Sequence, residues 1–579
     1  MSSRFYRVSR RLVGVIAVLL RAGQVVAQPA VMAPPDMAQG VDKVFERWAR
    51  PGSPGCAVGV SQQGAPTLMK AYGHANLELG VAITPESIFE SGSVAKQFTA
   101  AAIGLLVLDG KLAVTDKVRK YVPELPAFAS EVTIQHLLTH TSGLREQWPL
   151  LSLAGRPPTE AVHTIDEILD LTSRQRRPNF APGEHYLYNN TAFTLLSVIV
   201  SRVSGQSFQA FSDARLFKPI GMRSTSWREN HRAIVQGRTT AYRQTRDGRF
   251  ETLMSITNVI GNGGLLTTVG DLLQWNANLD DPKVGGRALV EWLETRGRLN
   301  DGFENDYARG LTVTRYKGLR EVSHGGSTAG YQTFLTRFPD ARVSVAVLCN
   351  TTGTNPGGMA HQVADLVLAG RLREEQPVPS AKAGSEALTG HAGLYRNPAS
   401  GALLDVIMTK DGLRLQRDTG PRLLFLGGSR FTTEGGGEYV FETGAGDGPP
   451  RLVEKPGNTH PSTWVKVERA TPSAEALGEY AGRYTSLELE VSYHAALRNG
   501  KLTLRYHGDT PLVLEPADRD SFLFEDGVVR FTRDGAKRVD GFEVYAGRIW
   551  HVRFDRESNG GGTQARRASP APRIAKSRP

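Results

Sequence analysis

The chain has 579 residues, of which 40% are hydrophobic, 22% charged and 8% aromatic. This composition excludes a wholly disordered or collagen-like protein, and the length predicts roughly three or four domains. The formal net charge is +11, but much of the excess lies at the ends: residues 1–27 hold five arginines and no acid, and residues 557–579 hold five basic residues and one acid. The nearly neutral body gives no reason to expect a nucleic-acid partner. The basic C-terminal segment also contains Gly560-Gly561-Gly562, and we expect it to be a disordered tail.

Residues 1–27 have the layout of a cleavable export signal. Several arginines precede the apolar run Leu12–Leu20, and Val25-Val26-Ala27 provides a small-residue cleavage site, so the mature chain would begin at Gln28. The apolar run is too short for a membrane span, and no later stretch reaches about 18 apolar residues. We therefore expect a periplasmic or secreted protein with no integral span in its mature form. Export would use the general secretory route or, given Arg10-Arg11, the twin-arginine route.

Residues 28–375 mix helix-like and strand-like segments and predict one large α/β domain. Ser93–Leu108 is rich in alanine and leucine and stops shortly before Gly110, which predicts a helix. Thr333–Arg337 and Val343–Leu348 flank a Pro-Asp turn and predict a β-hairpin.

The two cysteines, Cys56 and Cys349, each belong to an apolar, strand-like run. Two cysteines make neither a disulfide framework nor a zinc tetrad. If the two runs are neighbouring antiparallel strands, the start of the first faces the end of the second and a bridge is feasible. The interpretation favoured by the sequence alone is a pair of buried free thiols.

The C-terminal part of the chain contains a repeat. A linker rich in Pro, Ala, Ser and Gly spans residues 376–386. Two modules follow, at 387–470 and 475–556, and the segment that opens the first recurs at the start of the second. The offset is 89 residues, so that Tyr395 corresponds to Tyr484. Both modules are dense in short strands and turns, which predicts two small antiparallel β-barrels or sandwiches.

Three short motifs carry residues capable of chemistry, and the first is Ser93-Val94-Ala95-Lys96 at the predicted helix start. A spacing of three places Ser93 and Lys96 on one helix face, so the lysine can take or steer the proton of the hydroxyl. The helix N-terminus would supply backbone N–H groups where an oxyanion forms. Taken alone, the motif fits a helix cap beside a solvated lysine better than it fits a catalytic pair.

The second motif is Tyr188-Asn189-Asn190, which precedes an apolar helix. A phenol acts as a base near neutrality only if its pKa falls well below ~10, and a nearby ammonium group lowers it. Tyr188 is therefore expected close to Lys96. The third motif is His324-Gly325-Gly326, before the predicted hairpin. Its glycines would let a substrate backbone approach the strand edge, and His324 would supply a donor or cation.

In this order the motifs resemble the signature of the serine β-lactamase and penicillin-binding-protein superfamily, which is Ser-x-x-Lys, Tyr-x-Asn and Lys-Thr-Gly or His-x-Gly. His136–Leu144 and Gly263-Gly264-Leu265 match the same superfamily, and the resemblance covers about residues 40–355. It implies an α/β, β-lactamase-like fold, in which an antiparallel sheet is flanked by helices beside an all-helical subdomain. Two small all-β antiparallel barrel modules would follow this domain.

The resemblance also implies a reaction. Ser93 would be the acylated nucleophile, Lys96 and Tyr188 the proton-transfer pair, and the backbone N–H groups of Ser93 and Ser327 the oxyanion hole. The acyl-enzyme would then be hydrolysed. No cofactor and no metal are implied.

For the substrate, the resemblance implies that Asn190 orients the lysine and the substrate amide and that His324 and Gly326 line the site. Where relatives have Lys-Thr-Gly, the lysine holds a substrate carboxylate. A histidine of ordinary pKa near 6.5 is mostly neutral at pH 7, so this anchor is lost here. His-x-Gly is typical of the D-aminopeptidase, esterase and amide-hydrolase branches, and a catalytic domain followed by two β modules resembles the layout of D-stereospecific aminopeptidases. Hydrolysis of small amides or peptides, with a preference for D-amino acids, is therefore the favoured function.

Other functions stay open at this point: a carboxylesterase, a weak β-lactamase or penicillin-binding protein, and a catalytically silent binder of cell-wall fragments. Retention of Ser93, Lys96, Tyr188 and Asn190 together weighs against the silent binder. A zinc hydrolase is disfavoured because the pair His136-x-x-x-His140 lacks the glutamate of the zinc-protease pattern. The sequence does not determine the leaving group, the role of the β modules or the oligomeric state.

Overall fold

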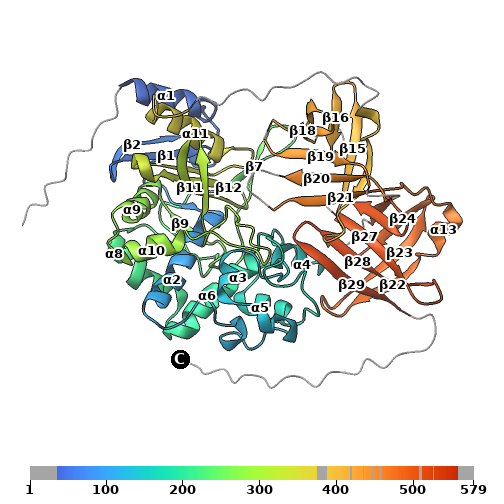
Figure 1. The fold of residues 1–579 in the computed structure, drawn as a ribbon. Coiled ribbons are helices and arrows are strands. Elements are labelled where there is room, and N and C mark those ends of the chain that lie inside the picture. Colours follow the sequence, from blue (N-terminus) through green and yellow to red (C-terminus); the bar gives the residue numbers. More distant parts are fainter. Residues whose placement is uncertain are drawn as a thin grey trace, which may run out of the picture.

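The computed structural model describes residues 35–373, 388–416, 420–434, 436–444, 448–455, 460–506, 511–525 and 527–557. Within them, a large α/β domain precedes two β modules (Figure 1). The expected export signal at 1–27 and linker at 376–386 lie outside these residues, as does the basic tail from residue 558 onward. In the described part of the chain, no helix is both long and apolar enough to cross a membrane.

The α/β domain is built on a six-stranded antiparallel sheet with the strand order β10-β11-β12-β13-β1-β2. Its strands are β1 (Cys56–Gln62), β2 (Ala65–Tyr72), β10 (Thr312–Tyr316), β11 (Leu319–Thr328), β12 (Tyr331–Phe338) and β13 (Val343–Cys349). The predicted hairpin is confirmed, because β12 and β13 pair directly.

Helices cover both faces of this sheet, which explains why the central strand β13 is buried along its whole length. Alternate residues of β13 belong to different cores. Val345 and Val347 join the core formed with α1 (Pro35–Phe45) and α11 (Pro356–Val367), while Ala346 and Leu348 join the core formed with α9 (Val269–Asp280). The strand's continuous apolar run therefore serves two cores at once.

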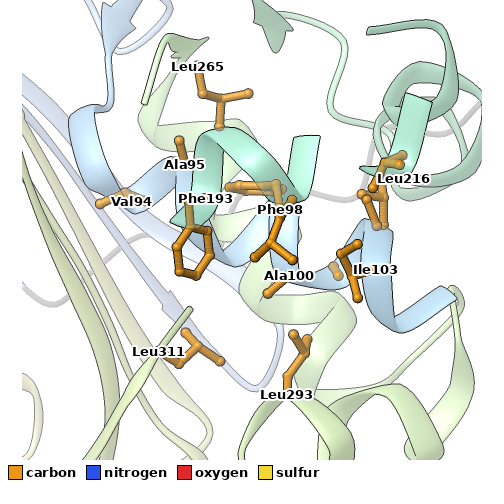
Figure 2. Packing of buried hydrophobic residues seen from close by; sticks show 14 of the residues in the cluster. Val94, Ala95, Phe98, Ala100, Ile103, Phe193, Leu216, Leu265, Leu293 and Leu311 are labelled. Atoms are coloured by element: carbon orange, nitrogen blue, oxygen red, sulfur yellow. The ribbon is translucent and has the colours of Figure 1, made fainter. Parts of the chain in front are cut away.

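The remaining helices of the domain are α2 (Lys96–Leu108), α3 (Ile134–Leu138), α4 (Gln147–Leu153), α5 (Ile165–Ser173), α6 (Asn190–Ser204), α7 (Phe208–Ser212), α8 (Lys218–Ile220) and α10 (Gly286–Leu293). Of these, α6, α7 and α10 contact α2, and α3, α4 and α5 contact α6 (Figure 1). Helix α2 is apolar on nearly every side, as expected of a buried central helix. Figure 2 shows Phe98 of α2 among side chains of other elements, including Phe193 of α6. The predicted helix at 93–108 divides in two, because Gly92–Ala95 form a 3₁₀ turn, η2, before α2 begins.

Cys56 and Cys349 face each other across β1 and β13 and form a disulfide. The antiparallel placement that made a bridge feasible is confirmed, and the favoured interpretation of two free thiols is wrong. The sequence could not decide between them, because an apolar run does not reveal its partner strand. The bridge joins residues 293 apart in the sequence and so closes a loop containing nearly the whole domain.

Both C-terminal modules are antiparallel β structures, which confirms the predicted fold class. The first is an eight-stranded sheet, nearly closed by a bridge between Arg414 and Arg422. Its strands are β14 (Gly393–Arg396), β15 (Leu403–Thr409), β16 (Gly412–Leu415), β17 (Leu424–Gly427), β18 (Arg430–Thr432), β19 (Glu438–Glu442), β20 (Arg451–Lys455) and β21 (Ser462–Val467).

The second module is a closed barrel of eight strands. After the short helix α13 (Ala474–Gly478), its strands are β22 (Gly482–Ser486), β23 (Val491–Arg498), β24 (Lys501–Arg505), β25 (Leu512–Pro516), β26 (Ser521–Phe524), β27 (Gly527–Arg533), β28 (Val539–Ala546) and β29 (Ile549–Arg556). The repeat is visible in one shared contact. Tyr395 donates to the carbonyl of His391, and Tyr484 donates to the carbonyl of Tyr480, each at 2.8 Å.

The closed barrel docks on the helical part of the α/β domain. Side chains of α4 and α5 share a hydrophobic cluster with the barrel interior. At this interface Arg145 is wholly buried and forms an ion pair with Glu488, which is also buried. The Arg145 guanidinium also donates to the backbone carbonyls of Trp550 and His551 in β29, at 2.9 and 2.8 Å. A buried charge with these partners fixes the barrel in one position.

We predict that Glu488→Ala lowers the free energy of unfolding by about 3–5 kcal/mol, because it leaves the Arg145 charge buried without its partner. The matched control Glu251→Ala removes an ion pair in which both side chains are about half exposed, and this should cost about 1 kcal/mol or less. Denaturant unfolding measures both. Equal losses in the two variants would contradict the interpretation of Arg145–Glu488 as a structural anchor.

A second prediction concerns the disulfide. The double variant Cys56→Ala/Cys349→Ala should lose about 2–5 kcal/mol of stability, because the unfolded chain gains the freedom that the cross-link removes. The unfolding midpoint with and without a reducing agent tests this. The wild type should respond to the reductant, whereas the double variant should not.

Candidate active site

Ser93 lies in η2 at the wall of a cavity of about 820 Å³. Residues far apart in the sequence meet here, and those of the predicted site that line the cavity are Ser93, Tyr188, Asn190, His324, Gly326 and Ser327. Lys96 lies directly behind this wall and has no exposed surface. The structure thus brings all the predicted site residues together.

The Lys96 amine is surrounded by three oxygen atoms. Its Nζ lies 3.0 Å from Ser93 Oγ, 2.7 Å from Asn190 Oδ1 and 2.6 Å from the backbone carbonyl of Asn262. The two carbonyl oxygens can only accept hydrogen bonds, so they take two N–H groups whether or not the amine is protonated. In the neutral amine the remaining position is a lone pair directed at the Ser93 hydroxyl. This geometry suits removal of the serine proton.

Burial lowers the pKa of Lys96 well below its ordinary 10.5. The nearby charge of Glu146 raises this pKa and that of Arg548 lowers it, but both effects are smaller than that of burial. Glu146 is itself wholly buried, and it accepts from the backbone N and side-chain Nδ2 of Asn190 at 2.6 and 3.1 Å. Asn190 therefore links Lys96 to Glu146 and holds its carbonyl toward the amine.

Tyr188 stands close to Lys96, as predicted, with the lysine Nζ 4.8 Å from its ring centroid. The expected lowering of its pKa is wrong, however. Burial raises the pKa of Tyr188 above its ordinary 10, and a contact with Ser93 offsets only part of that rise. Within the described structure, the buried hydroxyl has no hydrogen bond of ordinary geometry. Tyr188 is therefore a protonated phenol, suited to donating a proton and not to acting as a standing phenolate.

His324 is neutral, because burial, with a smaller effect of the Lys96 charge, lowers its pKa to about 4. Its Nδ1 lies 2.6 Å from the carbonyl oxygen of Gly325, which fixes the ring proton on Nδ1. The Nε2 atom then accepts from the hydroxyl of Tyr307 at 3.0 Å. The His-x-Gly motif therefore presents a neutral ring to the site.

Two glycines allow strand β11 to approach the turn that carries Ser93. A β-carbon at Gly326 would lie 2.0 Å from the carbonyl oxygen of Ser91 and 3.0 Å from the backbone N of Ser93. Gly92 has φ +52°, and a β-carbon there would lie 2.6 Å from the backbone N of Ser327. The backbone amides of Ser93 and Ser327, predicted to form the oxyanion hole, therefore belong to one tight junction.

The sequence analysis missed a residue that the second barrel supplies. Arg548 lies between β28 and β29 and lines the same cavity as Ser93. Its guanidinium carbon is 5.5 Å from the ring centroid of Tyr188, and its Nη1 is 3.5 Å from Glu146 Oε2. Glu146 was missed as well. No sequence signal pointed to Arg548.

Known proteins resemble this chain along much of its length. Residues 41–369, more than half of the chain, match the beta-lactamase family. The D-aminopeptidase of Brucella canis is 27% identical over 459 residues, covering 79% of this chain and 83% of that protein. The D-aminopeptidase of Gluconobacter oxydans is 28% identical over 444 residues, covering 76% and 81%. Among solved structures, the octameric penicillin-binding protein homologue from Pyrococcus abyssi superimposes with a TM-score of 0.52 at 22% identity, over 82% of this chain and 98% of that one.

The charges around Lys96 give a prediction with a definite sign. Modification of Ser93 by an organophosphonate should speed up as pH rises through the lowered pKa of Lys96, because the neutral amine is the form that accepts a proton. Glu146→Gln removes the carboxylate that raises this pKa, so the rise in rate should move to lower pH.

The control Glu131→Gln changes a carboxylate whose side chain is 72% exposed, and it should leave the profile in place. A shift to higher pH in Glu146→Gln, or no shift, would contradict the assigned role of Lys96.

Proposed function

The chain belongs to the beta-lactamase family, and from this premise we propose a serine hydrolase that cleaves small amide or peptide substrates through an acyl intermediate on Ser93, with a preference for D-amino acid residues. The observation that carries the reaction is the Lys96 amine, which is buried, depressed in pKa and 3.0 Å from Ser93 Oγ.

Acylation can be followed proton by proton. The neutral Lys96 takes the Ser93 proton while Oγ attacks the substrate carbonyl carbon, and the backbone N–H groups of Ser93 and Ser327 stabilise the negative oxygen. The carbon–nitrogen bond then breaks. Tyr188 donates its proton to the departing amine and recovers one from the Lys96 ammonium, so the site returns to its starting protonation state.

Deacylation repeats these steps with water in place of the amine. Lys96 takes a proton from the attacking water, the ester bond to Ser93 breaks, and the serine oxygen regains its proton. Asn190 keeps the amine oriented throughout, because Glu146 holds its amide group from behind.

The D-amino acid preference is supported by relatives named D-aminopeptidase that match along most of both chains. The agreement extends past the catalytic domain, because the matched length exceeds the 329 residues of the beta-lactamase match. A neutral histidine at position 324 agrees with a substrate other than the penicillins that Lys-Thr-Gly enzymes hold by a carboxylate.

We also propose that the protein is exported to the periplasm or beyond. The arginines, apolar run and cleavage site of residues 1–27 support this. So does the Cys56–Cys349 disulfide, since such bonds persist in oxidising compartments.

Our prediction for the reaction uses the anilides of N-acetyl-D-alanine and N-acetyl-L-alanine, which carry no charged group. The wild type should release aniline from the D-isomer faster, and its intact mass after mixing should show an acyl adduct. Ser93→Ala should lower kcat/KM by at least roughly 10³-fold and show no adduct, because it removes the nucleophile. The exposed-site control Ser173→Ala should behave as the wild type. Equal rates with both isomers would overturn the D-preference, and turnover surviving in Ser93→Ala would overturn the acyl-serine route.

A further inference from the structure

We propose that Arg548, which the second barrel places in the Ser93 cavity, binds a carboxylate group of the substrate. This inference rests on the proposed hydrolase function and adds to it a preference for substrates that carry an anionic group near the scissile bond.

The hairpin that carries Arg548 is held firmly by its main chain. Asn179 of the α/β domain donates from Nδ2 to the carbonyl of Arg548 at 3.0 Å and accepts from the backbone N of Trp550 at 2.8 Å. Arg145 holds the next carbonyls of the same strand, those of Trp550 and His551. None of these contacts uses the Arg548 side chain. The side chain is therefore positioned by the fold but is not needed to hold the fold.

The guanidinium itself is incompletely satisfied. Its side chain is 34% exposed, and it meets Glu146 in an ion pair of 3.5 Å, which is longer than a hydrogen bond. Among the described residues, no side chain or carbonyl accepts a hydrogen bond from the Arg548 guanidinium in the ordinary geometric range. An arginine presents a planar fork of five N–H donors. Most of that fork remains available at the cavity wall.

Among the described residues at the cavity, no carboxylate is left unpaired to receive a substrate ammonium. Among the described residues that line the cavity, Glu90 is the only acid. Its side chain is 1% exposed, and it pairs with both Arg228 and Arg238. Glu146 behind the wall is wholly buried and occupied by Asn190. The cations near the cavity therefore outnumber the acids, whether or not Lys96 carries its proton.

A carboxylate is the substrate group that fits this excess of positive charge. A guanidinium binds a carboxylate through two parallel charge-assisted hydrogen bonds, which are stronger than neutral ones. His324 is neutral and cannot supply such an anchor, so Arg548 provides at the same cavity a cation that the His-x-Gly motif lacks. A free amine at the same place would instead meet an uncompensated positive charge.

The carboxylate can belong to either side of the scissile amide, and two matched substrate pairs separate these cases. For the acyl side, N-succinyl-D-alanine anilide is compared with its succinamoyl analogue. For the leaving side, N-acetyl-D-alanyl-glycine is compared with the corresponding glycinamide. Each pair differs only in a carboxylate replaced by a carboxamide, so the ratio of kcat/KM within a pair isolates the charge.

In the wild type, the acid of one pair should be preferred by roughly tenfold to a hundredfold, the range of a charge-assisted contact. In Arg548→Gln that ratio should fall to about one, and Arg548→Lys should retain part of it because the charge remains. The control Arg519→Gln alters an arginine of the same barrel that is 86% exposed, and it should keep the wild-type ratio.

Binding to the inactive Ser93→Ala variant gives a readout that needs no turnover. Calorimetry of the same pairs should show the same preference in Kd, again lost on adding Arg548→Gln. Ratios near one in both pairs, or a ratio that Arg548→Gln leaves unchanged, would overturn the proposal. An equal fall for acid and amide would also overturn it, because it would show that Arg548 acts only on the shape of the site.

These outcomes are distinct from failure of the proposed function. If D- and L-substrates react equally while the carboxylate ratio depends on Arg548, the D-preference falls and the anion site stands. If no amide is cleaved, the ratio of the Kd values for the acid and the amide of each pair, measured in Ser93→Ala, still shows whether Arg548 forms an anion site.

Discussion

The structure depends on a primary amine placed where water does not reach. Lys96 has no exposed surface, and an isolated ammonium in such a place would cost far more than the fold could offset. The chain meets this constraint in two ways. It surrounds the amine with oxygens from Ser93, Asn190 and Asn262, and burial lowers the pKa so that the neutral form becomes accessible. Burial destabilises the protonated form of Lys96, and for the same reason it favours the neutral amine that can take the serine proton.

Two adjacent residues, Arg145 and Glu146, connect the second barrel to the catalytic site. Arg145 holds the barrel by its buried ion pair and backbone contacts. Glu146, the next residue, holds Asn190 and faces Arg548. Two adjacent side chains therefore have different roles. Arg145 docks the barrel, and Glu146 supports the asparagine that contacts Lys96. Because the barrel in turn supplies Arg548, the cavity is complete only when the second module is in place.

The features that could be predicted from the sequence are those that depend on local residue patterns. Ser93 and Lys96 could be paired from helical spacing, and the order of the motifs predicted the fold and the convergence of Tyr188, Asn190 and His324. The repeat centred on Tyr395 and Tyr484 predicted two β modules. What escaped prediction depends on contacts between distant segments. The disulfide required the strand pairing, the pKa of Tyr188 required its burial as well as its distance from Lys96, and Arg548 required the docked position of a barrel whose own sequence carries no catalytic pattern.

The central claim is that burial lowers the pKa of Lys96 well below that of an exposed lysine, and nuclear magnetic resonance of lysine side chains tests it most directly. In protein labelled with ¹³C at lysine Cε, the signal missing from Lys96→Arg identifies the residue, and its shift against pH reports its titration. The account predicts a midpoint well below 10.5, while exposed lysines titrate near their ordinary value. A Lys96 midpoint at or above 10.5 would contradict the account, because a permanently protonated lysine cannot take the proton of Ser93.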